Sequence, residues 1–206
     1  MHFVLPRLYP ITDERLSGLP HAEQVERLAA GGASLIQLRE KTASPRVFYY
    51  AALEAMKVAR RVGVRIIIND RVDIAMAVDA DGVHLGQGDV PPGHARRLLG
   101  EARIVGFSTH SAKQALEVDC ASVDYIAIGP VFQTSTRQNP EAIVGLEAIA
   151  IIKRQASKPL VAIGGITLAR ALSVIQAGAD SVAVISDLFS TNDISGRTRD
   201  FIDRMR

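Results

Sequence analysis

The chain has 206 residues, of which 48% are hydrophobic and 22% are charged, and its formal net charge is +2. This composition is typical of a globular protein and excludes a disordered or fibrous one. The small net charge, with Lys and Arg interspersed among Asp and Glu, argues against a nucleic-acid or membrane-surface partner, so that any anion site must be local.

The sequence also carries signals about where the protein works. No apolar run approaches the ~20 residues of a transmembrane helix, and the first residues lack the charged-then-apolar order of a signal peptide. We therefore expect a cytoplasmic protein. Cys120 is the only cysteine, which excludes an internal disulfide and a cysteine-rich zinc site. We expect it to be a buried structural thiol.

Eight short runs rich in β-branched residues alternate with helical stretches along the whole chain. This alternation is typical of repeated βα units and a parallel sheet. The predicted strands are residues 7–12, 34–39, 64–69, 82–85, 103–108, 124–129, 160–164 and 181–186. After the second strand, apolar residues at helical spacing predict a helix whose core-facing stripe is Val47, Ala51, Ala55, Val58 and Val62.

The number of βα units predicts the architecture. Eight units without a linker rich in Pro, Gly or Ser favour an α/β fold in which residues 1–206 form a single (β/α)8 barrel domain. An open, doubly wound sheet is the alternative, because strand count alone does not prove closure. In such a barrel, functional residues lie at the carboxyl ends of the strands.

Polar side chains follow the second predicted strand. Alternation along a strand places Gln37, Arg39 and Lys41 on one side, toward the barrel mouth, and Leu38 and Glu40 on the other. Two cations and an amide would then face a common ligand. The alternative is that both cations are solvated or pair with the local glutamate.

Carboxylates follow the third and fourth predicted strands. Asn69 and Asp70 end the third strand, and Asp89 lies in the loop after the fourth. Neighbouring strands lie ~4.8 Å apart, so these two carboxylates can share a hard cation such as Mg²⁺, whose shell a diphosphate completes. Alternatively, each aspartate caps the helix that follows it.

Small residues follow the last two predicted strands. Gly164 and Gly165 come after the seventh strand, and Ile185 and Ser186 end the eighth. Glycines let backbone N–H groups approach an anion closely, and barrels frequently bind phosphate in the loops after strands seven and eight. A plain turn is the alternative for the glycine pair.

Further polar groups follow strands five and six. The loop after strand six offers the hydroxyls of Thr134, Ser135 and Thr136 and the guanidinium of Arg137, unless it is simply an exposed polar loop. Ser108 could donate a hydrogen bond or cap the next helix. The spacing of His84 and His110 does not form a metal pair, so we interpret both as structural or supporting residues, with proton transfer open for His110.

Taken together, these segments resemble the thiamine phosphate synthase family. The ordered set is QLREK, INDR, GVHLGQGD, GFSTH, GPVFQTSTR, AIGGIT and VIS, and the likeness runs from YPITD to GADSVAVIS. The resemblance implies a (β/α)8 enzyme with Mg²⁺ as its cofactor. Its reaction joins 4-amino-2-methyl-5-(diphosphomethyl)pyrimidine to a thiazole phosphate, or the carboxylate of that thiazole, and gives thiamine phosphate and diphosphate.

The resemblance also implies residue roles, position by position. The pyrimidine diphosphate would be bound by Gln37, Leu38, Arg39, Glu40, Lys41, Asn69, Ser108 and Arg137. The thiazole phosphate would be bound by Thr134, Ser135, Thr136, Gly165, Ile185 and Ser186, and Mg²⁺ by Asp70 and Asp89. Arg39, Lys41, Ser108 and Arg137 would be catalytic. Arg137 departs from the usual Lys of the family, which keeps the charge but replaces an ammonium with a planar guanidinium.

Two other functions compete with this interpretation. A related thiazole tautomerase shares the barrel and the phosphate site but shifts only a proton and needs no metal. A barrel that merely senses a phosphorylated metabolite would have no need for Asp70 and Asp89. The expected partners are therefore small molecules, and a homo-oligomer remains open.

Overall fold

The computed structural model describes residues 4–118, 122–134 and 142–206. In chain order its elements are β1 (Leu8–Thr12), α1 (Glu14–Ser17), α2 (His21–Ala30), β2 (Leu35–Leu38), α3 (Pro45–Val62), β3 (Arg65–Asn69), α4 (Val72–Ala77), β4 (Gly82–Leu85), α5 (Pro92–Leu99), β5 (Ile104–Thr109), α6 (Ala112–Val118), β6 (Tyr125–Ile128), α7 (Gly145–Gln155), β7 (Leu160–Ile163), α8 (Leu168–Gln176), β8 (Ser181–Val184), the 3-10 helix η1 (Ser186–Phe189) and α9 (Ile194–Arg204). Each predicted strand coincides with an observed one, and the ends agree within two residues.

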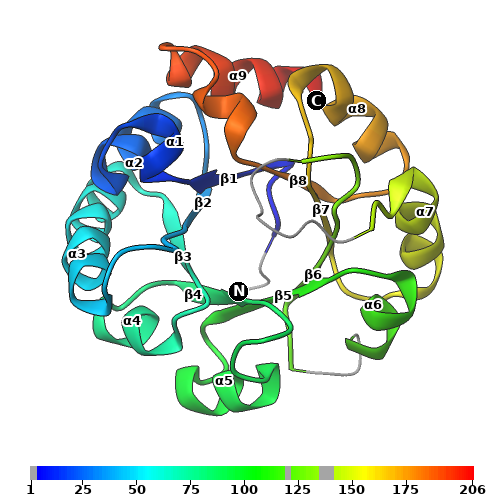
Figure 1. Ribbon diagram of the computed structural model, residues 1–206, viewed down its shortest axis with the longest axis horizontal. Helices are drawn as coiled ribbons and strands as arrows, with labels where there is room; N and C mark the ends of the chain where they lie inside the picture. The colour runs from blue at the N-terminus through cyan, green and yellow to red at the C-terminus, as the bar shows by residue number, and fades with distance from the viewer. Residues whose placement is uncertain (1–3, 119–121, 135–141) are drawn as a thin grey trace.

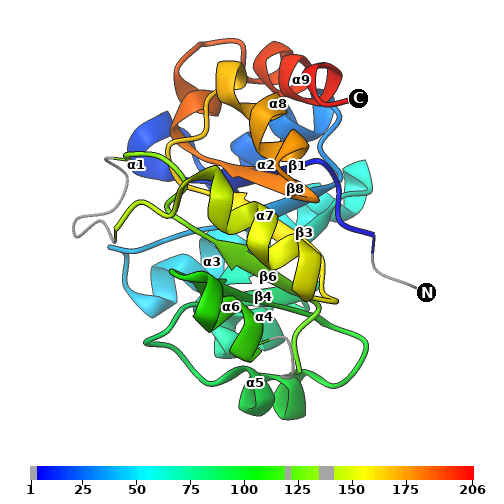
Figure 2. The same ribbon diagram turned by 90° about the vertical axis from the view of Figure 1, so that its right-hand side faces the viewer.

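The eight strands form a closed parallel barrel in sequence order. Closure comes from the pairing of β1 with β8, in which Tyr9 lies opposite Ala183. This pairing confirms the barrel and excludes the open sheet. Figure 1 looks down the barrel and shows the helices as an outer ring around the strands. In Figure 2 the chain enters from the right and α1, which follows β1, lies on the left, so the carboxyl ends of the strands face left.

Side-chain alternation along the strands creates two hydrophobic cores. Leu35 and Ile67 point into the barrel and pack there with Tyr9 and Tyr125. The residues that alternate with these along each strand, such as Ile36, point outward and pack under the helices. Since successive side chains of a strand point to opposite faces, the inward set continues at the strand ends as polar residues. The barrel interior therefore leads directly into a polar mouth.

The helix α3 illustrates how local signals set the boundaries of a helix. Ser44 caps its start by accepting a hydrogen bond from the backbone N–H of Val47, and Pro45 occupies the first turn. Gly63 ends it in the left-handed conformation that glycine adopts without strain.

The predicted apolar stripe of this helix was partly wrong. The buried face of α3 consists of Phe48, Ala52, Ala55, Met56 and Ala59, whereas Val47 and Val62 are exposed. The ring of Phe48 and the thioether of Met56 bury more apolar area than the valines, so the helix turns that face to the sheet.

Of the helices in residues 4–118, 122–134 and 142–206, none combines the length and the apolar character needed to cross a bilayer.

Candidate functional site

A pocket opens at the carboxyl ends of the strands. Its lining combines residues from all eight strand ends: Ile11, Gln37, Arg39, Lys41, Asn69, Asp70, His84, Gly86, Ser108, Thr109, His110, Gly129, Pro130, Thr134, Ile163, Gly164, Gly165, Ile166, Ala183, Val184, Ile185 and Ser186. The structure thus brings together candidates that are up to 149 positions apart in the chain, from Gln37 to Ser186. Polar groups gather at one edge of this pocket and glycine backbone at another.

The segment after β2 presents its side chains alternately to this pocket, as predicted. Gln37, Arg39 and Lys41 line it. Leu38 is buried in the outer core, and Glu40 is not among the lining residues. Alternation explains the difference, because neighbouring side chains leave the strand on opposite faces.

The two cations of this segment have specific partners, and neither partner is the local Glu40. The Arg39 guanidinium binds the Asp13 carboxylate with an Nη1–Oδ2 distance of 2.7 Å, and both side chains are largely buried. The ammonium of Lys41, which is half exposed, binds the carboxylate of Asp70. The alternative of a local pair with Glu40 is therefore wrong.

Asp70 and Asp89 come together at the ends of β3 and β4. The backbone N–H of Asp70 donates to the carbonyl oxygen of His84 on β4 at 2.8 Å, which ties the two strand ends together. Asp89 folds back so that its carboxylate accepts a hydrogen bond from the Gly86 N–H at 2.7 Å. Asp70 itself has a φ of 64°, a left-handed conformation that Asp adopts more readily than most residues.

The helix-cap alternative for these two aspartates is wrong. The residue that precedes α4 is Arg71, and α5 follows Pro91; neither helix start has a side-chain cap. Burial raises the pKa of Asp89, and the negative charge of Asp70 raises it further. Two carboxylates this close together form an arrangement that a cation stabilises.

Asn69 adds an unused donor to the same edge. Its side chain is 6% exposed and lines the pocket, yet its amide Nδ2 has no hydrogen-bond partner. Buried donors without a partner are rare and costly in native proteins. Because Asn69 lines the pocket, a ligand with acceptor oxygens is the kind of partner that would satisfy this donor.

A chain of hydrogen bonds crosses the barrel interior and ends at Ser108. The Gln37 amide donates to the Tyr9 hydroxyl at 3.1 Å, which bonds the Tyr125 hydroxyl at 2.9 Å. Tyr125 contacts Nδ1 of His84 at 2.9 Å, and Nε2 of His84 contacts the Ser108 hydroxyl at 2.8 Å. Burial raises the pKa of both tyrosines, so both stay protonated.

This chain sets the role of Ser108. Each hydroxyl hydrogen finds an acceptor if Tyr9 donates to Tyr125 and Tyr125 donates to Nδ1 of His84. The hydrogen of the imidazole then lies on Nε2, which donates to the Ser108 hydroxyl. Ser108, which lines the pocket, then keeps its own hydroxyl hydrogen to donate. The next helix is capped by Ser111 instead, which accepts from the backbone N–H of Gln114 at 3.2 Å. Sequence reasoning missed both tyrosines, because an aromatic residue in a strand signals only burial.

His110 lies on the pocket lining with a defined tautomer. Its Nδ1 lies 2.8 Å from the carbonyl oxygen of Gly129, and a carbonyl can only accept, so Nδ1 carries the hydrogen. In the neutral ring Nε2 is then an acceptor.

The backbone around Gly164 and Gly165 is fixed by the loop after β6. Both glycines have positive φ, 102° and 62°, and a Cβ at Gly165 would overlap the carbonyl oxygen of Gln133. The Phe132 N–H donates to the Gly164 carbonyl at 3.0 Å. Side chains are thus excluded here, and the bare backbone borders the pocket.

The remaining phosphate-site candidates divide into two groups. Thr134, Ile185 and Ser186 line the pocket, and Ser186 begins the short helix η1. Ser135, Thr136 and Arg137 lie outside the described residues, as does Cys120. Their predicted roles remain predictions.

This chain is similar to known proteins in both sequence and fold. Residues 8–188 match the model of a family described as thiamine monophosphate synthase. A thiamine-phosphate synthase of Chloroflexus aurantiacus is 45% identical over 199 residues, covering 96% of this chain and 92% of the relative. A thiamine-phosphate synthase of Koribacter versatilis is 46% identical over 191 residues, 89% of each chain. The structure of a thiamine phosphate pyrophosphorylase from Pyrococcus furiosus superposes with a TM-score of 0.87 at 37% identity, covering 97% of this chain and 95% of that one.

Proposed function

Since this chain is a transferase that belongs to the thiamine monophosphate synthase family, we propose that it joins 4-amino-2-methyl-5-(diphosphomethyl)pyrimidine to a thiazole phosphate. The products are thiamine phosphate and diphosphate. One observation carries this proposal: a single pocket is lined by the cations Arg39 and Lys41, by the carboxylate of Asp70, whose charge adds to burial in raising the pKa of the nearby Asp89, and by the glycine backbone after β7. Two different phosphorylated substrates need two different anion sites.

The first anion site suits the diphosphate. Arg39 and Lys41 supply positive charge, and Asn69 and Ser108 supply neutral donors. The ammonium of Lys41 pairs with Asp70, and its side chain is half exposed. A ligand phosphate can therefore reach this ammonium. Arg137 and the backbone of Leu38 and Glu40 complete the proposed set of contacts.

Asp70 and Asp89 suit Mg²⁺. Both offer carboxylate oxygens, the donors that this ion prefers, and Mg²⁺ commonly binds one or two carboxylates together with substrate phosphates. A cation also relieves the unfavourable charge interaction that raises the pKa of Asp89. When bound, the ion would neutralise charge on the departing diphosphate.

The reaction then requires that the two substrates be positioned and that the negative charge of the departing diphosphate be stabilised. The bond between the pyrimidine methylene carbon and the diphosphate oxygen breaks, and its electron pair leaves with the oxygen. Arg39, Lys41 and Arg137 stabilise the growing negative charge, and Ser108 donates a hydrogen bond to it. The thiazole nitrogen then uses its lone pair to form the new bond with the methylene carbon. Holding both reactants in one pocket contributes much of the remaining rate.

The second anion site suits the thiazole phosphate. Among the described residues we assign to it the Gly165 backbone, Ile185, Ser186 and the hydroxyl of Thr134. The contacts of Ser135 and Thr136 are those that the family resemblance implies. The positive φ of Gly165 and the overlap that any Cβ would cause there keep the backbone accessible. Phosphate binding after strands seven and eight is frequent in barrels of this type.

We expect Ser186→Ala to raise the KM for the thiazole phosphate about 10-fold and to leave kcat nearly unchanged, because a hydrogen bond to a charged group contributes about 1.5 kcal/mol. Steady-state kinetics with saturating pyrimidine diphosphate measure it. Ser190→Ala is the matched control, since that hydroxyl bonds the Asp187 carbonyl at 2.8 Å and does not line the pocket. An unchanged KM for the Ser186 variant would contradict the proposed phosphate contact.

A second candidate function rests on His110. Its Nε2 is an acceptor at the pocket lining, which suits the proton shift of a thiazole tautomerase. Such an enzyme would not need the cation cluster or the paired carboxylates.

Incubating the purified protein with both substrates separates these functions. The synthase forms thiamine phosphate and diphosphate with Mg²⁺ and stops when EDTA is added. A tautomerase isomerises the thiazole carboxylate with EDTA present and forms no thiamine phosphate. A sensor does neither, and in calorimetry it binds the thiazole phosphate equally with and without Mg²⁺. Either of the last two results would overturn the proposal.

A further inference from the structure

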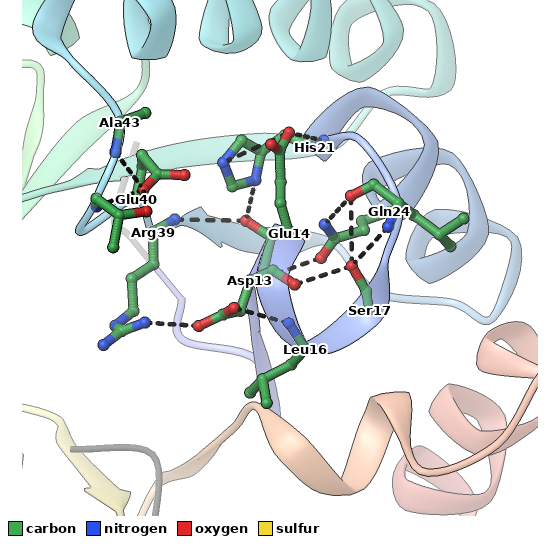
Figure 3. A network of polar contacts seen from close by, with 12 residues as sticks. Asp13, Glu14, Leu16, Ser17, His21, Gln24, Arg39, Glu40 and Ala43 are labelled. Atoms are coloured by element: carbon green, nitrogen blue, oxygen red, sulfur yellow. Dashed lines mark hydrogen bonds and ion pairs between the residues drawn. The ribbon is translucent and has the colours of Figure 1, made fainter. Parts of the chain in front are cut away.

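Glu14, His21 and Glu40 form a cluster next to the pocket but outside its lining. They come from α1, the start of α2 and the segment after β2. Each offers one ligand atom, and these atoms all lie within 4.8 Å of one another. Figure 3 shows the three side chains converging from these separate segments. None of the three belongs to the proposed Mg²⁺ pair.

The imidazole of His21 is buried with one nitrogen unused. The residue is 1% exposed, and its Nε2 has no hydrogen-bond partner. This nitrogen faces the carboxylate of Glu14 at 4.0 Å, and the ring of Phe48 lies against the imidazole with centroids 5.9 Å apart. A buried nitrogen without a partner, next to the Glu14 carboxylate, is the observation that points to a ligand.

The hydrogen bonds behind the ring determine which nitrogen carries the proton. The Thr12 hydroxyl donates to the carbonyl oxygen of Gln37 at 3.2 Å, so its contact with His21 Nδ1 at 2.7 Å is one in which the hydroxyl accepts. Nδ1 therefore carries the hydrogen, and Nε2 of the neutral ring presents its lone pair. Metal-binding histidines are oriented in this way, by a hydrogen bond from the other ring nitrogen.

The pKa shifts of His21 and Glu40 favour the deprotonated forms that bind metal ions. Burial lowers the pKa of His21, which keeps the ring neutral. Burial alone would raise the pKa of Glu40, but hydrogen bonds from the N–H groups of Thr42 and Ala43 outweigh it and lower that pKa. Ligands that are already deprotonated need release no proton to bind a metal.

The two carboxylates lack a Lys or Arg partner within the described part of the chain. The ion pairs of Lys and Arg among residues 4–118, 122–134 and 142–206 include neither Glu14 nor Glu40. The Glu14 carboxylate accepts from the backbone N–H of His21 at 2.9 Å, which fixes one oxygen near the ring. Among residues 4–118, 122–134 and 142–206, no Lys or Arg thus compensates these two carboxyl groups beside the imidazole.

We propose that Glu14, His21 and Glu40 bind a divalent transition-metal ion of the Zn²⁺ class, at a site separate from the Mg²⁺ pair. One imidazole and two carboxylates, with water in the fourth position, form a donor set suited to Zn²⁺. Imidazole disfavours Mg²⁺, which prefers oxygen donors. The ligand atoms lie at most 4.8 Å from one another, so each needs to shift by only about 1 Å to reach ~2.1 Å from a shared ion.

Such an ion would stabilise the segment that carries the pocket cations Arg39 and Lys41. Glu40 lies between Arg39 and Lys41, and the backbone N–H of Arg39 donates to the same Thr12 hydroxyl that orients His21, at 3.4 Å. An ion bound there joins the segment after β2 to α1 and α2. The role is structural, and it does not depend on which reaction the pocket carries out.

Titration of the metal-stripped full-length protein tests the proposal. Isothermal titration calorimetry with ZnCl₂ should show a site that saturating Mg²⁺ does not block, and thermal denaturation should show a higher Tm with Zn²⁺. Substituted Co²⁺ should absorb visible light with the intensity of a low-coordinate site that has a nitrogen ligand.

The decisive variant is Glu14→Gln, because this side chain is 38% exposed and its replacement should not disturb folding. We expect it to weaken Zn²⁺ binding at least about 10-fold and to abolish the Tm increase. Glu23→Gln is the matched control, a half-exposed glutamate of α2 that pairs with Arg27, and it should bind Zn²⁺ as the wild type does. Asp89→Asn should also retain the site. Unchanged Zn²⁺ binding in Glu14→Gln, or loss of the site in Asp89→Asn, would overturn the proposal.

Discussion

Asp70→Asn should lower kcat by at least about 100-fold at saturating Mg²⁺ and leave the fold intact. The variant removes a carboxylate that we assign to the metal, while the asparagine keeps the shape of the side chain. Asparagine also tolerates the left-handed backbone at this position, where φ is 64°. Alanine would be a poorer test, since that conformation costs it roughly 1 kcal/mol. Steady-state kinetics and a thermal melt measure the two effects separately.

Asp73→Asn provides the control for this experiment. Asp73 lies on the neighbouring helix α4, is largely exposed and pairs with Arg71, so its loss changes the local charge equally without touching the pocket. Its kcat should stay near that of the wild type. If Asp70→Asn retained normal turnover and lost stability instead, the aspartate would be structural and the metal assignment would fail.

Arg39→Gln should lower kcat about 100-fold or more, because it removes a cation from the group that stabilises the departing diphosphate. It should also destabilise the protein. The guanidinium is 16% exposed and its partner Asp13 only 8%, so the substitution leaves a buried carboxylate without its counter-ion, at a cost of about 2 kcal/mol. Denaturant unfolding measures this second effect.

A double variant separates catalysis from stability. Asp13→Asn combined with Arg39→Gln removes both charges, and the asparagine oxygen can still accept the hydrogen bond that Leu16 N–H donates at 3.0 Å. We expect the free energy of unfolding to recover in part and kcat to stay low. Recovery of kcat together with stability would show that Arg39 acts only by supporting the fold. Arg61→Gln, which breaks an exposed pair with Glu26, serves as the surface control.

The two aspartates illustrate what the sequence pattern can predict and what it cannot. Asp70 and Asp89 could be assigned to adjacent strand ends from the order of the runs alone, since consecutive strands of a barrel are neighbours. The sequence favoured a metal site for the pair, although Asp taken singly is also a common helix cap. The observed helix starts, after Arg71 and Pro91, exclude the caps, and the metal site stays a proposal.

Residues that sequence reasoning missed share one property. Each of them contacts a residue that is distant in the sequence. Tyr9 bonds Tyr125, which lies 116 positions away, and Asp13 pairs with Arg39, which lies 26 positions away. Periodicity reports only which face of an element a residue occupies. It carries no information about which distant side chain meets that face, so neither the hydrogen-bond chain to Ser108 nor the partner of Arg39 was predictable.

The sequence by itself determined the eight βα units, their strand positions and the inward side of each strand, because these depend on side-chain spacing within a few residues. It also placed Gln37, Arg39 and Lys41 together, since alternation is a local rule. Only the tertiary structure decided that β1 closes on β8 and that His21, with one unpartnered nitrogen, lies next to Glu14 and Glu40. Such contacts depend on how separate segments meet in space, and that geometry is a property of the packed barrel rather than of any one segment.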